Sequence, residues 1–154
     1  MPCCLTLSCA IARSGWEIRG YCYSVCCVLK PAEDGIQLGW SNYDSPGSDT
    51  GSNASLNAEY VTVKNTSSTT RSLTGYTLRD KANHVYKFGT FSLGGGKFVR
   101  IHTGKGTNTS TDRYWGREWY VWNNTGDKAY PRNADFVLRD TCEWTSVGSG
   151  YKWC

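Results

Sequence analysis

The sequence contains little methionine, little proline and few charged residues, and it has no long hydrophobic run. One methionine and four prolines occur in 154 residues, and charged side chains make up 19% of the chain. No apolar stretch approaches the roughly 20 residues that a membrane-spanning helix needs, and no heptad repeat suggests a coiled coil. A hydrophobic share of 39% with so little charge excludes a disordered chain. We therefore expect no transmembrane segment, no coiled-coil rod and no helical bundle.

Aromatic side chains and glycine are abundant instead. The chain has seven tryptophans, ten tyrosines and 17 glycines, and aromatic residues make up 14% of it. Aromatic side chains favour strands, and glycine favours the tight turns between them. The composition therefore predicts an all-β fold, and the length suits one ordinary domain.

The cysteines divide the chain near residue 34. Six of the eight lie within the first 27 residues, at spacings that fit no zinc site. No basic residue precedes the first apolar stretch, so the charged start of a signal peptide is missing. We predict a Cys-rich segment of residues 1–34 that is poorly ordered or results from a misplaced start codon. Residues 35–154 are predicted to form the folded domain.

The net charge of the chain is +4, from 17 basic and 13 acidic residues. Residues 1–34 carry three charges of each sign, so the whole excess lies in residues 35–154. A weak attraction to polyanions follows from this charge alone. An ordinary solvated surface is the interpretation that the sequence favours.

From residue 36 onward, short runs of alternating apolar residues are separated by turn-forming clusters. This spacing is typical of a sandwich of two antiparallel sheets. No sustained helical period is present. The sequence predicts an Ig-like antiparallel β-sandwich of about eight or nine short strands, with long loops at 44–53 and 103–117. The expected strands are 36–43, 59–64, 73–79, 84–88, 90–93, 98–102, 119–122, 127–132 and 136–144.

Several of these segments together resemble the lamin tail domain family. The segments are EYVTVKN at 59–65, LTGYTLRD at 73–80, YKF at 86–88, FSL at 91–93, FVRI at 98–101 and WNNTGD at 122–127. The long loop at 44–53 and the two C-terminal cysteines resemble the bacterial branch of that family, which is often found in secreted proteins of actinobacteria. The resemblance implies an Ig-like β-sandwich that is noncatalytic, serves in binding or anchoring, and works outside the cell.

Cys142 and Cys154 are the two cysteines of the predicted domain, and we predict a disulfide between them. Gly148 and Gly150 lie in the segment that joins them and allow the chain to fold back. A disulfide would hold the last residue, which otherwise frays. The alternative is a pair of free thiols, with the buried one acting as a small apolar side chain.

No group of residues argues for catalysis, a metal or a cofactor. The two histidines, His84 and His102, are accompanied by no G-x-S-x-G nucleophile elbow. The oxygen-rich loop at 44–53 lacks the spacing of an EF-hand and reads as turns, with a bound cation as the alternative. The glycine-rich stretches at 94–97 and 103–108 do not continue as a phosphate loop does. We predict no enzyme, no metal and no cofactor.

The densest aromatic cluster offers the best candidate binding residues. They are Arg113, Tyr114, Trp115, Arg117 and Trp119. Exposed rings stack on sugars or on bases, and arginine adds cation–π or phosphate contacts. The alternative is that these rings pack in the core and under the loops.

The leading prediction for function is a noncatalytic lamin-tail-like module that binds or anchors outside the cell. Its partner is an unknown protein or polysaccharide. The alternative is a carbohydrate-binding module that uses the aromatic face from Trp115 to Trp122. The protein is expected to be a monomer.

Overall fold

The computed structural model describes residues 34–154, which form eleven strands and one short helix, α1 (Asn53–Ala58). Apart from Asp34, the predicted segment of residues 1–34 lies outside the described residues. The strands are β1 (Ile36–Asn42), β2 (Tyr60–Asn65), β3 (Arg71–Ser72), β4 (Thr77–Arg79), β5 (Val85–Lys87), β6 (Ser92–Leu93), β7 (Phe98–His102), β8 (Asp112–Tyr114), β9 (Asp127–Arg132), β10 (Cys142–Trp144) and β11 (Tyr151–Trp153).

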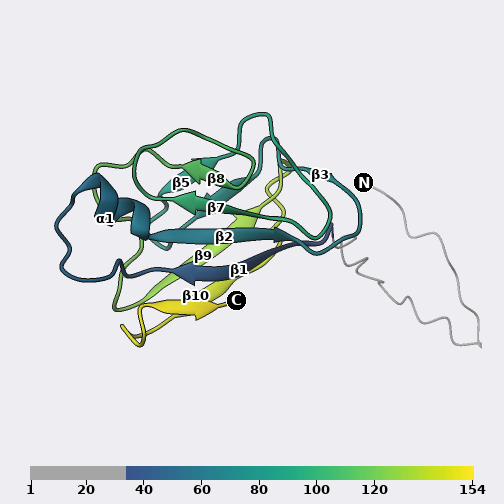
Figure 1. Ribbon diagram of the computed structural model, residues 1–154. Helices are drawn as coiled ribbons and strands as arrows, with labels where there is room; N and C mark the ends of the chain where they lie inside the picture. The colour runs from purple at the N-terminus through teal and green to yellow at the C-terminus, as the bar shows by residue number, and fades with distance from the viewer. Residues whose placement is uncertain (1–33) are drawn as a thin grey trace, which may run out of the picture. The chain divides into compact units, whose positions relative to one another are not determined.

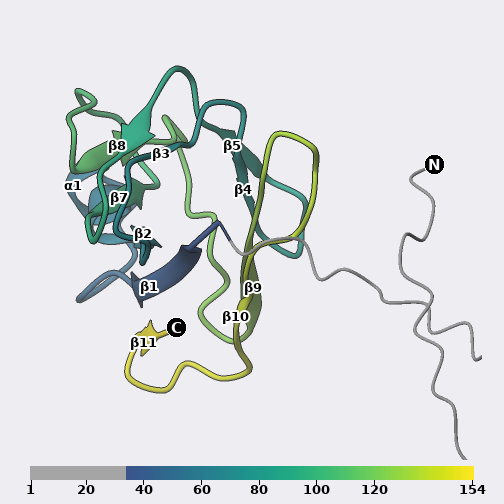
Figure 2. The same cartoon turned by 90° about the vertical axis from the view of Figure 1, so that its right-hand side faces the viewer.

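Nine of these strands form two sheets that face each other. The larger sheet has the order β11-β1-β2-β7-β8, and the smaller has the order β10-β9-β4-β5. β3 and β6 form a separate two-stranded sheet. Figure 1 shows β1, β2, β7 and β8 of the larger sheet side by side, and Figure 2 shows the two sheets as separate layers. The predicted all-β, Ig-like sandwich is therefore confirmed.

Alternating residues of the strands fill the space between the sheets. Val61 and Val63 of β2 pair with Ile101 and Val99 of β7, and all four side chains are at most 1% exposed. Leu78 from the smaller sheet is fully buried in the same core. This alternation of two residues per repeat decides which side chains of each strand are left to face outward.

Replacing Val61 with alanine should lower the free energy of unfolding by about 1–3 kcal/mol, because burial is lost and a cavity remains. Val85 is 40% exposed on β5 and provides the matched control. The Val85→Ala variant should stay within about 0.5 kcal/mol of the parent in urea unfolding. Equal effects of the two substitutions would contradict the register of β2.

The predicted strand at 119–122 is wrong. Residues 119–122 pair with no strand and instead follow an irregular path. Glu59, which is fully buried, accepts hydrogen bonds from the backbone N–H groups of Val121 (3.2 Å) and Trp122 (3.0 Å). The Glu59 carboxyl group accepts hydrogen bonds from the N–H donors that a strand would direct to a neighbouring strand. Trp122 enters the core without sheet pairing.

Strand β3 lies outside the predicted strands, and three other elements also differ from the sequence-based expectation. Helix α1 lies just after the predicted loop at 44–53, and one short helix leaves no periodic pattern to detect. Strand β8 lies inside the predicted loop at 103–117 and runs parallel to β7, so the larger sheet is not purely antiparallel. Strand β11 lies beyond the last predicted strand and pairs with β1. Strands β8 and β11 form because they pair with β7 and β1, which lie elsewhere in the sequence.

Cys142 and Cys154 form a disulfide, with 5.5 Å between their Cα atoms. The predicted bond is therefore confirmed. Cys142 begins β10 in the smaller sheet, and Cys154 directly follows β11 in the larger one. The yellow C-terminal segment in Figure 2 crosses from one layer to the other. The disulfide thus fastens the two sheets together at the C-terminus.

Asp34 already belongs to the sandwich. Its carboxylate accepts hydrogen bonds from the Tyr76 hydroxyl and from the backbone N–H of Ile36, the latter at 3.0 Å. The Nε atom of Arg139 lies 3.1 Å from the same carboxylate. The folded part of the chain therefore includes Asp34, one residue before the boundary that the sequence suggests.

Candidate functional site

The outward surface of the larger sheet gathers aromatic side chains from all five of its strands. Because Val61 and Val63 point inward, their neighbours Tyr60, Thr62 and Lys64 point outward. The same alternation applies on the adjacent strands. We call this outward surface the aromatic face, and its aromatic residues are Trp40, Tyr60, Phe98, Tyr114, Tyr151 and Trp153.

Two tryptophans form the centre of this face. Trp40 of β1 lies directly opposite Trp153 of β11 in the strand register, and their ring centroids are 6.3 Å apart. Tyr151 stacks on Trp40 with 4.6 Å between the centroids and 25° between the planes. The register between β1 and β2 shifts between Leu38 and Ser41, next to Trp40. Such bulges turn a side chain relative to the regular pleat.

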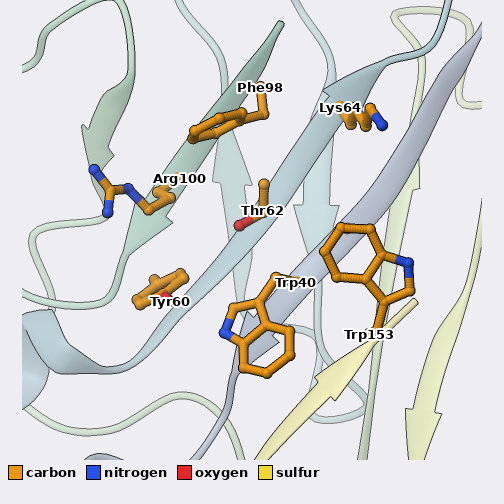
Figure 3. Close-up of a pocket in the computed structure, with 8 residues that line it drawn as sticks. Trp40, Tyr60, Thr62, Lys64, Phe98, Arg100 and Trp153 are labelled. Atoms are coloured by element: carbon orange, nitrogen blue, oxygen red, sulfur yellow. The ribbon is translucent and has the colours of Figure 1, made fainter. Parts of the chain in front are cut away.

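A groove of about 300 Å³ lies beside the tryptophans. Trp40 and Trp153 line one part of it, and Phe98 lines another. Figure 3 shows Thr62 between them, with Lys64 and Arg100 at the margin. Trp153 is 67% exposed and Phe98 is 49% exposed. Large rings with this exposure offer apolar area that a ligand can cover.

A polar network borders the groove on the β8 side. Asp112 lies 2.9 Å from both Arg100 Nε and His102 Nε2, and the His102 ring stacks on Tyr114. Partial burial raises the pKa of Asp112, but hydrogen bonds from Thr111 and His102 and the charge of Arg100 outweigh it and hold the pKa at about 2. The carboxylate is therefore ionised at neutral pH, and it holds Arg100 beside the aromatic rings.

The structure distributes the five predicted ligand-binding residues among separate places. Tyr114 lies on the aromatic face. The Arg113 guanidinium covers the Phe91 ring at 4.0 Å, and Trp115 packs on the core. Arg117 and Trp119 are exposed on the irregular segment, where Trp119 is 62% exposed.

No single surface from Trp115 to Trp122 therefore exists, since Trp122 is buried. Four residues of the aromatic face were not among the candidates predicted from the sequence: Trp40, Tyr60, Phe98 and Trp153. The first three occupy outward positions in strands that the sequence does predict, so alternation was the signal that could have found them. Trp153 lies in a strand that the sequence does not predict.

The other candidates from the sequence lie in turns and loops and among hydrogen-bonded pairs. No group of three or more His, Cys, Asp or Glu side chains within residues 34–154 is placed to hold a metal ion. Asp44 accepts a hydrogen bond from Asn124 at 2.8 Å, and its pKa is raised by burial and then by the charge of Asp49. His84 binds Asp80 in a turn. No helix in this part of the chain is long and apolar enough to cross a membrane.

The domain is a small Ig-like sandwich with an open aromatic face on one of its sheets. The Lamin Tail Domain family model matches residues 31–146, which is most of the chain, so the protein belongs to the lamin tail domain family. No curated protein matches the sequence. The family match ends before β11, so Tyr151, Trp153 and Cys154 lie beyond it.

Proposed function

We propose that the protein is a noncatalytic binding module that attaches to polysaccharide outside the cell. The observation that carries this proposal is the aromatic face, where exposed rings from neighbouring strands lie side by side next to a groove. Apolar rings provide platforms on which the flat faces of sugar rings pack. The polar network of Arg100 and Asp112 at the margin supplies hydrogen-bonding groups for hydroxyls.

The rigidity of this face supports the same function. Its rings are carried by strands rather than by loops, and Trp40 and Tyr151 stack on each other. The disulfide at Cys154 anchors β11 immediately after Trp153. A surface that is set in place before binding loses less conformational entropy when a ligand arrives.

The disulfide also supports a location outside the cell. Such bonds persist in oxidising compartments and are rare in the cytosol. The location agrees with the secreted bacterial branch that the sequence resembles.

Replacing Trp40 and Trp153 with alanine should abolish most of the binding to polysaccharide. The probes are cellulose, chitin, xylan, mannan and peptidoglycan, tested first with the unmodified protein and then with the Trp40→Ala and Trp153→Ala variants. Binding to at least one probe is expected, with a loss of tenfold or more in affinity for each variant. Trp119→Ala is the matched control, because the Trp119 ring is 62% exposed, against 67% for Trp153, and lies outside the aromatic face. It should change affinity less than twofold.

Three outcomes would contradict the proposal. Absence of binding to every probe would remove polysaccharide as the ligand. Loss of binding in Trp119→Ala alone would assign the ligand to the segment at 113–122. A dimer that becomes monomeric on Trp153→Ala would assign the aromatic face to self-association, and light scattering measures this directly.

A further inference from the structure

The outward surface of the smaller sheet is unlike the aromatic face. On β9, Asp127, Ala129 and Pro131 are buried, so Lys128, Tyr130 and Arg132 point outward. Arg79 of β4 lies opposite Tyr130 in the register. Lys87 of β5 pairs with Thr77, which also pairs with Arg132. The register therefore gathers cations from three strands, and we call this surface the basic face: Arg79, Lys87, Lys128, Tyr130 and Arg132.

Little negative charge opposes these cations. Glu143 of β10 lies opposite Lys128, at 3.9 Å, and is bound more closely by Lys81, at 2.8 Å. Within residues 34–154, Arg79, Lys87 and Arg132 form no salt bridge. Three of the four cations on this face are thus paired with no carboxylate within the described residues.

Asp80, which follows β4, and Asp127, which begins β9, are not available to neutralise the face. Asp80 and Asp127 are buried, with exposed fractions of 0% and 3%. Asp80 accepts hydrogen bonds from the backbone and ring of His84. Asp127 accepts hydrogen bonds from backbone N–H groups, including those of Lys81 and Asn123. Both carboxylates bind groups in turns and do not reach the cations of the basic face.

A hollow of about 200 Å³ lies within the basic face. Lys128, Tyr130 and Arg132 line it together with Leu138 and Thr141. The Arg132 guanidinium is 5.7 Å from the Tyr130 ring. Lys128 and Arg132 are four residues apart on one strand, which is about 13 Å from Cα to Cα at the usual rise of a strand.

We propose that the basic face is a second binding site, and that its ligand is an acidic polysaccharide. One sugar ring packs against Tyr130 and Leu138 in the hollow, and carboxylate or sulfate groups on either side pair with Lys128 and Arg132. Those two cations lie on either side of Tyr130 along one strand, which suits successive anionic groups on a polymer.

The basic face has one aromatic ring between its cations. Single-stranded nucleic acid binds through several rings on which successive bases stack. That arrangement is absent among the described residues of this face, which is why a polysaccharide is the better match. The site does not depend on the proposed function, because the two faces belong to different sheets.

The test is affinity electrophoresis through gels that contain heparin, polygalacturonate or neutral dextran. The unmodified protein should be retarded by the two acidic polymers and not by dextran. The double variant Lys128→Gln, Arg132→Gln should bind the better acidic polymer at least fivefold more weakly. Lys97→Gln, Arg117→Gln is the matched control, because it removes the same charge from exposed positions elsewhere. It should change binding less than twofold.

Several results would overturn this second site. Equal losses in the two double variants would show that only the net charge matters. Duplex DNA that binds as tightly as heparin, with the same dependence on Lys128 and Arg132, would remove the preference for polysaccharide. Loss of acidic-polymer binding in Trp153→Ala, with Lys128→Gln, Arg132→Gln unaffected, would move the ligand to the aromatic face. Thermal unfolding of each variant verifies that the fold is intact.

Discussion

Replacing Glu59 with alanine is expected to lower the free energy of unfolding by about 3–5 kcal/mol. The side chain is fully buried and accepts hydrogen bonds from the Thr103 hydroxyl and from the N–H groups of Val121 and Trp122. Its removal leaves three buried donors without a partner, and each such group costs about 1–3 kcal/mol. Urea unfolding followed by tryptophan fluorescence measures the loss. Glu118→Ala is the control, since Glu118 is exposed, and it should change stability by less than about 0.5 kcal/mol.

The same carboxyl group should make stability depend on pH. Burial raises the pKa of Glu59 from its ordinary value of 4.5 to about 8, although its hydrogen bonds oppose the shift. Between these values the folded protein binds a proton that the unfolded chain does not bind. The contribution of the protonated Glu59 side chain to the free energy of unfolding is therefore fully present below pH 4.5 and is lost as the pH rises through 8.

Glu59→Gln removes the titrating group and should flatten this dependence between pH 5 and pH 8. The NH2 group of the glutamine would face one of the three hydrogen-bond donors that Glu59 accepts from. Two donors cannot bond to each other, so a moderate loss of stability is expected at every pH. A parent protein whose stability rises between pH 5 and pH 8, by an amount that Glu59→Gln abolishes, would show that the carboxyl is ionised in the fold.

Removing the disulfide is the second large change. The variant Cys142→Ala, Cys154→Ala should lose about 3 kcal/mol, because the unfolded chain gains the freedom that a short closed loop denies it. Intact mass before and after reduction and alkylation verifies the bond in the parent. Val147→Ala, in the same segment, is the control and should leave stability nearly unchanged because Val147 is 45% exposed. A double variant as stable as the parent would contradict the prediction.

The disulfide variant should also weaken binding at the aromatic face. β11 pairs with β1 through three residues, and its side chains are exposed. The bond at Cys154 adds a covalent link to the pairing with β1 and to the stacking of Tyr151 on Trp40, which hold this exposed strand in its sheet. Fraying of β11 would separate Trp153 from Trp40 and divide the proposed sugar platform. The polysaccharide-binding assay used for the tryptophan variants therefore also tests the disulfide variant.

Strands with clear alternation could be located from the sequence. The prediction for 127–132 has the bounds of β9, and that for 98–102 has the bounds of β7. In β7, Val99 and Ile101 at every second position mark one buried face, and in β9 the buried positions Asp127, Ala129 and Pro131 also alternate. Alternation of this kind is a local property of the chain. Residues 119–122 do not follow this rule. Their aromatic side chains suggest a strand, but the buried Glu59 carboxyl group accepts the hydrogen bonds of the Val121 and Trp122 N–H groups.

The sequence alone therefore determined the class of fold, the family resemblance and the two cysteines that pair, because composition, alternation and motifs are local. Only the tertiary structure decided which side chains share a surface. Trp40, Tyr60, Phe98 and Trp153 become neighbours through the strand order β11-β1-β2-β7, which joins segments from both ends of the domain. The cations of the basic face gather in the same way. Pairing between distant strands depends on how the whole core packs, and no local pattern records it.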